Sequence, residues 1–289
     1  MKIARILDSK VKETYGIISD DGKHVATKAE IQQQTGIPVP SNIKDFMFKG
    51  WLDEVRQQKG RLKYEHKIGD VELLVPIPNP PKIICLAFNY YDHAREAGLT
   101  PSDEPVIFMK PRTALNEPFR NVICPSFVTR LDYEAELAVV IGRETKKVPE
   151  DKALDSVFGY MILHDVSARD IQFKDKQFTR GKGIDTFAPC GPWITTRDEV
   201  ADPQSLQIMT KVNGEVRQNS SSSNMVIPVR RIISALSVTM TLEPGDIIST
   251  GTPAGVAMSM KEPRYLKHGD MVEITIEKLG IIKNRILFQ

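Results

Sequence analysis

Three acidic residues, Glu134, Glu136 and Asp165, stand in segments that are otherwise strongly apolar. Glu134 and Glu136 belong to LDYEAELAVVIG, and Asp165 belongs to VFGYMILHDVSARD. Both segments are predicted to be strands, because they are rich in β-branched and aromatic residues and lack a helical period. Residues two apart on a strand share a face, so the two glutamates point the same way. Buried carboxylates need compensating charge, and a divalent cation held by the three acids would supply it.

The residues around the Glu-x-Glu pair decide between two interpretations. Such a pair is commonly found on a solvated edge strand, where polar residues alternate along the chain. From Tyr133 to Ile141, however, the segment has no polar alternation beyond the two glutamates. We therefore predict a strand buried on both faces and a metal site on Glu134, Glu136 and Asp165. An all-oxygen ligand set favours Mg²⁺ first, then Mn²⁺ or Ca²⁺, over zinc.

A histidine and a glutamate, His93 and Glu96, lie three residues apart in NYYDHAREAG, a short helical pattern. Residues at this spacing are neighbours on one helix face. A carboxylate beside an imidazole is a common arrangement for a general base near neutral pH, although a surface ion pair has the same pattern. Gly98 and the following LTPSDEP indicate a segment able to close over a site as a lid.

Arg169 and Gln172 follow Asp165 by four and seven residues in HDVSARDIQ. If a helical turn begins directly after Asp165, the three side chains share a face. Arg169 would then bind a substrate carboxylate through two parallel hydrogen bonds, with Gln172 beside it. The alternative is that Arg169 only neutralises Asp165 or Asp170.

Two glycine-rich segments carry the remaining candidates. Lys182 stands between two glycines in TRGKGIDTFAPCGP, where the backbone can bring its ammonium close to a ligand. It is either an electrostatic clamp or an ordinary loop lysine. Thr252 lies at the centre of STGTPAGV, whose successive N–H groups can form a nest for a carboxylate. The same residues are also compatible with a plain tight turn, and the ending of a phosphate-binding P-loop is missing.

The elements that must position these residues fall into two stretches. Residues 1–75 are predicted to form a small N-terminal domain with strands at 1–8 and 15–25, a turn at Asp21-Gly22, and one amphipathic helix over residues 43–60. The proline-rich passage VPIPNPPKIICLAFNY is expected to link it to a catalytic domain over residues 76–289. There, short apolar segments alternate with turn residues, and helical patterns are confined to about residues 90–97 and 228–241. The predicted fold class is α+β, mainly β.

Bulk properties narrow the function. The 289 residues carry a formal net charge of +2, which gives no electrostatic reason to expect nucleic acid or a membrane surface as a partner. No apolar run approaches a membrane span, and the N-terminus lacks the pattern of a secretory or transit signal. The three cysteines are too few and too far apart for a disulfide framework or a zinc site. We expect a cytoplasmic protein, or a mitochondrial one if the source is eukaryotic.

Seven segments taken together resemble the fumarylacetoacetate hydrolase (FAH) superfamily, from about residue 83 to 270. They are NYYDHAREAG, DYEAELAVVIG, HDVSARDIQ, RGKGIDTFAPCGP, VNGEVRQ, TLEPGDIISTGTPAGV and LKHGDMVEITIEKLG. The resemblance implies a mixed β-roll catalytic domain, a small N-terminal domain and a homodimer. It also implies Mg²⁺ or Mn²⁺ (with Ca²⁺ able to replace them in crystals) on Glu134, Glu136 and Asp165, with His93–Glu96 as an acid–base pair on a closing lid. Lys182, Arg169, Gln172 and Thr252 match positions that hold and polarise substrate.

The sequence departs from the family pattern at two positions. Ala87 stands where many relatives have glycine, and it would reduce the space near the lid. His164 precedes Asp165 where many relatives have asparagine. His164 is either a second titrating group beside the metal or a buried core histidine.

The resemblance implies substrates that are short acids with a 2-oxo or 1,3-dicarbonyl group. We expect metal-dependent C–C cleavage, by hydrolysis or decarboxylation, of an acylpyruvate or oxaloacetate through an enolate held on the metal. The alternative is an oxaloacetate enol–keto tautomerase or a 2-hydroxy-diene-dioate isomerase that uses the same site. A more distant alternative is a non-catalytic binding protein of the same fold, although every expected catalytic and metal-binding residue type is present.

Overall fold

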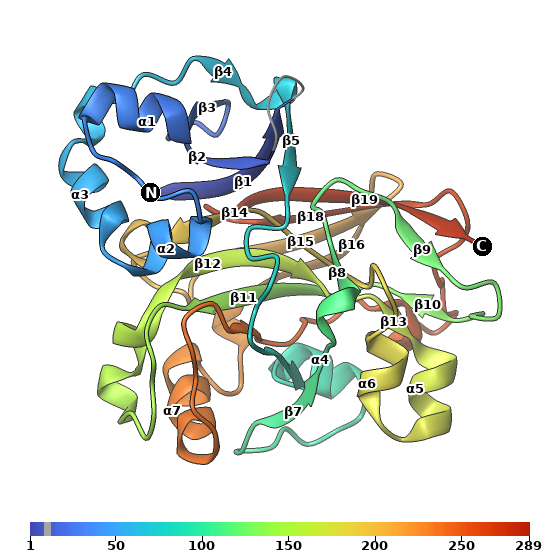
Figure 1. Cartoon of the computed structure of the whole chain (residues 1–289). Coiled ribbons are helices and arrows are strands. Elements are labelled where there is room, and N and C mark those ends of the chain that lie inside the picture. Colours follow the sequence, from blue (N-terminus) through green and yellow to red (C-terminus); the bar gives the residue numbers. More distant parts are fainter. Residues whose placement is uncertain (9–12) are drawn as a thin grey trace.

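The computed structural model describes residues 1–8 and 13–289, and strands dominate it (Figure 1). Within these residues, twelve strands form one large sheet with the order β4-β3-β2-β1-β14-β12-β11-β17-β6-β7, to which β5 is joined through β1 and β8 through β14. Their bounds are Lys2–Asp8 (β1), Thr14–Ile18 (β2), His24–Thr27 (β3), His66–Lys67 (β4), Val71–Leu74 (β5), Ile83–Ala87 (β6), Val106–Met109 (β7), Leu115–Asn116 (β8), Ala135–Ile141 (β11), Val157–His164 (β12), Ala188–Thr196 (β14) and Ile247–Ser249 (β17).

A second sheet of five strands has the order β16-β15-β18-β19-β9, and β10 pairs with β13 separately. The bounds are Val122–Cys124 (β9), Leu131–Asp132 (β10), Ser167–Ala168 (β13), Gln207–Val212 (β15), Glu215–Ser221 (β16), Met271–Ile276 (β18) and Gly280–Phe288 (β19). The main hydrophobic cluster takes residues from both sheets, among them Leu137 of β11, Ile208 of β15 and Ile274 of β18. The fold class is therefore α+β and mainly β, as predicted.

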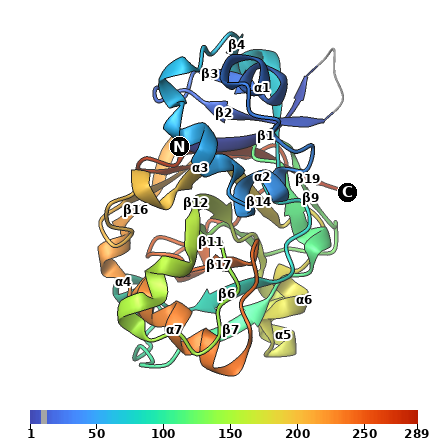
Figure 2. The same ribbon diagram turned by 60° about the vertical axis from the view of Figure 1, so that its left-hand side comes forward.

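In the N-terminal stretch, the first helix packs on β2 and β3 at the top of Figures 1 and 2, and two further helices lie below it. The helices are Lys28–Thr35 (α1), Ile43–Phe48 (α2) and Trp51–Gln57 (α3). The predicted single helix over 43–60 is wrong, because Gly50 adopts a left-handed conformation with φ 88° that ends one helix and begins the next. Helix α1 was not predicted, although Thr27 and Glu30 form a capping box at its start.

The large sheet continues from the N-terminal stretch into the rest of the chain. Strand β1 pairs antiparallel with β14, with Lys2 opposite Thr195 and Ile3 opposite Ile194. This junction is visible near the centre of both views (Figure 2). A domain boundary near residue 75 stays a prediction, because hydrogen bonds between strands run directly across it.

The other helices lie at the opposite end of the molecule from α1–α3 (Figure 1). They are Tyr91–Glu96 (α4), Arg169–Asp175 (α5), Phe178–Lys182 (α6) and Val229–Thr239 (α7), so helices do form in the two predicted regions. Short 3₁₀ turns occupy Lys59–Arg61, Ile68–Asp70, Arg112–Ala114, Glu150–Ser156, Arg197–Glu199, Ser222–Asn224 and Ala257–Ser259. Among the described residues, no helix is both long enough and apolar enough to cross a bilayer.

Candidate active site

Two neighbouring strands bring the three acids together. Glu134 precedes β11, Glu136 lies within it, and Asp165 follows the end of β12. Ala135 pairs with His164 across these antiparallel strands, and the backbone N–H of Asp165 donates to the carbonyl of Glu134 at 2.9 Å. One oxygen from each acid lies within 4.8 Å of the others, and all three residues are buried. Every residue of β11 is buried, which confirms the predicted two-sided burial.

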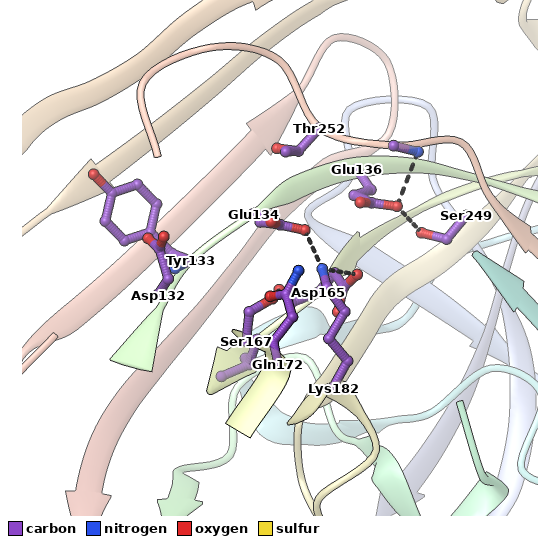
Figure 3. A network of polar contacts seen from close by, with 12 residues as sticks. Asp132, Tyr133, Glu134, Glu136, Asp165, Ser167, Gln172, Lys182, Ser249 and Thr252 are labelled. Carbon is purple, nitrogen blue, oxygen red and sulfur yellow. Dashed lines mark hydrogen bonds and ion pairs between the residues drawn. The ribbon is translucent and has the colours of Figure 1, made fainter. Parts of the chain in front are cut away.

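Two buried cations neutralise Glu134. The Lys182 ammonium lies 2.6 Å from Glu134 and 2.8 Å from Asp165, so it bridges the two acids (Figure 3). The Arg169 guanidinium contacts Glu134 at 2.6 Å. Burial alone would raise the pKa of Glu134, but the charges of Lys182 and Arg169 hold it well below its usual range. Glu134 therefore stays ionised, and Lys182 is not an ordinary loop lysine.

Asp165 has a second cationic partner that the sequence analysis did not single out. The Lys110 ammonium lies 2.7 Å from Asp165, and neither side chain is exposed. Lys110 also donates to the carbonyl of Phe187 at 2.9 Å and to that of Lys182. In the sequence, Lys110 is a single charged residue at the end of the apolar segment PVIFMKP. Glu134 drew attention in the same way, as a charged residue in an apolar segment, but it had Glu136 beside it. Without a partner in sequence, Lys110 could not be assigned to the site.

Glu136 differs from the other two acids, because only neutral groups hold it. It accepts hydrogen bonds from the Ser249 hydroxyl and, at 3.0 Å, from the backbone N–H of Gly251 (Figure 3). Among the described residues, no ion pair joins Glu136 to a cation. Burial and the neighbouring charges of Asp165 and Glu134 raise the pKa of Glu136 to about 8. A divalent cation among three carboxylates would remove this imbalance, so the residues fit a hard divalent ion.

Of the predicted acid–base pair, His93 lines the same cavity as Glu134 and Glu136, and Glu96 contacts His93. His93 and Glu96 lie on α4, with His93 Nδ1 3.5 Å from a Glu96 oxygen. Glu96 accepts from the backbone N–H of Gly255 at 3.1 and 3.2 Å, so its carboxylate is fixed from the far side. His93 is only 4% exposed, and it lines the cavity together with Glu134 and Glu136. A surface ion pair is therefore excluded.

Arg169 and Gln172 reach the cavity, but not by the predicted route. The helix does not start after Asp165; β13 intervenes, and α5 begins at Arg169 itself. Arg169 donates to Asp132 at 2.9 Å, to Glu134 at 2.6 Å and to Gln172 at 3.0 Å. Its charged partners are thus Asp132 and Glu134 rather than Asp165 or Asp170. Three of its five N–H groups are engaged, which leaves two for a ligand.

Thr252 lines the cavity and is fixed by two hydrogen bonds. Its hydroxyl donates to the carbonyl of Ala135 at 3.0 Å and accepts from Gln218 at 2.9 Å. The N–H groups expected to form an anion nest are partly used within the protein, since Gly251 donates to Glu136 and Gly255 to Glu96. This segment therefore positions the acidic side chains of the site.

His164 lies outside the cavity although it precedes Asp165. It is fully buried, and it pairs with Ala135, whose side chain faces away from the two glutamates on either side of it. Burial first, and then the charge of Lys110, lower the pKa of His164 to about 3. These observations favour the buried core histidine over the second titrating group.

Asp132, Ser249 and Gln218 complete the set that sequence reasoning missed. Asp132 accepts from Arg169 and from the N–H of Ala257, and Gln218 accepts from the N–H of Ala135 at 3.0 Å. Each of the three is hydrogen-bonded to a residue that lines the cavity. Ser249 and Gln218 could not be recognised from the sequence, because their partners are remote along the chain. Asp132 is the exception: its position two residues before Glu134 could have drawn attention to it.

Sequence and structure comparisons agree on the family. The model of the fumarylacetoacetate (FAA) hydrolase C-terminal family matches residues 82–287. The oxaloacetate tautomerase YisK of Bacillus subtilis (strain 168) is 41% identical over 288 residues, covering 94% of this chain and 95% of that protein. The fumarylacetoacetate hydrolase EaFAH of psychrophilic Exiguobacterium antarcticum has a TM-score of 0.83 and 34% identity, covering 100% of both chains.

A third match carries a different activity in its name. The structure of a 2-hydroxyhepta-2,4-diene-1,7-dioate isomerase from Mycobacterium marinum has a TM-score of 0.77 and 35% identity, and it covers 100% of this chain and 99% of that one. Proteins named tautomerase, hydrolase and isomerase thus share this architecture, which supports an enzyme and not a purely binding protein. With its matching segments and whole-chain structural similarity, the chain belongs to the fumarylacetoacetate hydrolase family.

Proposed function

We propose that the protein interconverts the enol and keto forms of oxaloacetate in a reaction that depends on Mg²⁺ or Mn²⁺. The observation that carries the proposal is that His93, which contacts Glu96, lines one small cavity together with Glu134 and Glu136, and that Lys182 bridges Glu134 to Asp165. The small size of this cavity favours a short acid. The relative named oxaloacetate tautomerase, similar over nearly its whole length, supports the same substrate.

The roles follow from the contacts around the acids. A divalent ion on Glu134, Glu136 and Asp165 would supply a Lewis acid that draws electron density from a 2-oxo carbonyl. Glu96 faces His93 Nδ1, which leaves Nε2 free to exchange a proton with C3 of the substrate. The Lys182 ammonium would balance the negative charge that develops on the substrate oxygen.

The substrate carboxylates need donors, and the side chains around the cavity can provide them. Arg169 has two N–H groups beyond its protein partners, and its bond to the Gln172 oxygen leaves the amide nitrogen of Gln172 for a ligand. Thr252 lines the same cavity, but its hydroxyl hydrogen is already donated to the carbonyl of Ala135. We propose Arg169 and Gln172 as the donors that orient the acid, with Thr252 as part of the surface against which the acid lies.

Cleavage of a C–C bond is the second candidate. Lys182 stands where it would stabilise an oxyanion, and the structural neighbour EaFAH is named a hydrolase. In hydrolysis, His93 would activate a water that attacks the carbonyl remote from the 2-oxo group. The homodimer is proposed on the family resemblance, the separate N-terminal domain on the resemblance and the proline-rich link, and the cytoplasmic location on the few, widely spaced cysteines.

Proton NMR of oxaloacetate with purified protein and Mg²⁺ tests the proposal, with EDTA and the Glu136→Gln variant as controls. Fast relaxation of the enol–keto ratio without pyruvate, abolished by EDTA, is the expected result. Pyruvate formation above the metal-only rate would replace the tautomerase by a decarboxylase. If neither change occurs, oxaloacetate is not the substrate, and acylpyruvates become the next compounds to assay.

A further inference from the structure

Two adjoining cavities meet at the end of β6. The site cavity is lined by Glu134, Glu136 and His93 among others, and the second, which we name the lid cavity, is bounded by Leu99, Thr100, Ser102, Glu104, Val106 and Ile227. The lid cavity is the larger of the two. Leu86, Ala87 and Phe88 line both cavities, so these residues form the partition between them.

Phe88 is the bulky part of this partition, and its position is strongly constrained. Its φ of 55° places it in the left-handed region, which a non-glycine residue seldom adopts. The ring stacks on His93 with centroids 5.9 Å apart and meets the edge of Phe178 at 6.2 Å. Phe178 in turn meets Phe108 at 5.5 Å, and the Lys182 ammonium lies 5.0 Å from the Phe108 ring. A row of rings therefore runs from the base to the lysine.

We propose that Phe88 and Phe178 form an aromatic wall that limits the length of the acid accepted by the site. A chain that extends from the carbon beyond the 2-oxo group of an acid held at the carboxylates would have to pass Phe88, against whose ring Phe178 packs, to reach the larger lid cavity. The proposal rests on the function proposed above and adds a size limit to it. Short acids of about four carbons fit in front of the wall, and longer ones collide with it.

The residues that line the lid cavity indicate which longer chains would enter it if the wall were removed. Leu99, Val106 and Ile227 offer apolar contact, whereas Glu104 is the charged side chain on that side. A carboxylate at the end of a long chain would meet the like charge of Glu104, while an alkyl chain would bury apolar surface. Opening the wall therefore favours uncharged alkyl chains over dioic acids.

Replacing Phe88 by glycine is the direct test, because glycine adopts positive φ without strain and removes the ring. The probes are pyruvate and 2-oxooctanoate, which need no turnover, titrated by calorimetry into protein saturated with Mn²⁺. The ratio of the two affinities should shift toward 2-oxooctanoate by about tenfold or more, since a few methylenes in an apolar pocket are worth that much. Phe88→Leu should shift it less. Phe173→Ala, which removes an exposed phenylalanine on α5 outside both cavities, should leave it unchanged.

Phe178→Ala provides a second test that does not alter the strained backbone at Phe88. An unchanged affinity ratio in both Phe88→Gly and Phe178→Ala, with folding verified by circular dichroism, would overturn the proposal. So would tight binding of 2-oxooctanoate by the wild type. Absence of oxaloacetate turnover in the wild type is a separate result: it rejects the proposed reaction and leaves the comparison of bound acids valid.

Discussion

Glu134 and Glu136 of the acid cluster line one cavity with His93 of the His93–Glu96 pair, but the cluster and the pair are built on different parts of the fold. Glu134, Glu136 and Asp165 are carried by β11 and β12, and β11 is hydrogen-bonded on one side to β12 and on the other to β17. His93 and Glu96 are carried by α4, a helix of six residues followed by a largely exposed loop at 98–104. The acids therefore belong to the interior of the sheet, and the proposed base belongs to a short helix outside it.

The acid cluster and the base have different physical requirements, and the fold places each on an element that meets its own. Three carboxylates at close range need a fixed environment, because a small displacement would leave charge buried without a partner. A base that exchanges a proton with an entering acid needs access, and an element with few buried contacts opens at lower cost than a central strand. Closure of the α4 segment as a lid remains a prediction. The following variants test whether the acid cluster and the His93–Glu96 pair act independently.

The largest effect is expected from Glu136→Gln. The amide keeps the shape of the side chain and removes the charge of a proposed ligand, so Mn²⁺ affinity should fall by more than the roughly 10- to 100-fold that loss of an outer hydrogen-bond partner costs. Calorimetric titration of Mn²⁺ measures it, with the exposed Glu277→Gln as the matched control. Unchanged affinity would reject Glu136 as a ligand. Thermal unfolding of the metal-free variant should show that the fold is retained.

His93→Ala should affect turnover and not metal binding. Loss of a general base lowers kcat by about 10²- to 10⁴-fold, while Mn²⁺ affinity should match that of the wild type because His93 lies on α4 and not on the strands. His66→Ala, a change at a partly exposed histidine paired with Glu30, is the control. Retained kcat would place the base elsewhere, and a parallel loss of metal affinity would show that the two regions are not independent.

Metal binding should depend on pH through Glu136. Its pKa is raised to about 8, so below that pH a proton must leave before the carboxylate can bind the ion. The apparent affinity should therefore fall by about tenfold per unit as pH drops from 8 to 6, and level off above 8. Calorimetry in two buffers of different ionisation enthalpy counts the protons released. An affinity that is flat over this range contradicts the assignment.

The smallest effect concerns His164, which lies next to Asp165 but faces away from it. Its folded pKa, about 3, lies below the unfolded value of about 6.5, so the unfolded chain takes up the proton first. Stability from the neutral imidazole is complete above pH 6.5 and is lost as pH falls toward 3. Between pH 6.5 and 5.5, in EDTA, the unfolding free energy of wild type relative to His164→Asn should drop by about 1 kcal/mol. Urea unfolding at both pH values measures this difference, and an equal difference between the two proteins at both pH values would contradict the prediction.

Local pattern was sufficient for part of this protein. The apolar run around Glu134 and Glu136 predicted a buried strand with both acids on one face. Both the period of a strand and its burial can be inferred from residues that are close in sequence. The predicted helix over 43–60 failed at Gly50, where the sequence does not reveal a left-handed backbone until packing selects it. For the same reason, the route by which Arg169 reaches the site could not be derived from its spacing to Asp165.

The sequence by itself determined which residue types could build a metal and acid–base site, and on which strand and helix the principal ones lie. Only the tertiary structure decided the charge balance. Lys110 reaches Asp165 from 55 positions earlier in the chain, and Ser249 reaches Glu136 across 113 positions. In the same way, Lys182 and Arg169 keep Glu134 ionised from 48 and 35 positions away, while Glu136 is left among neutral donors. Electrostatic environment depends on distance in space and on exclusion of water, and neither is encoded in the order of nearby residues.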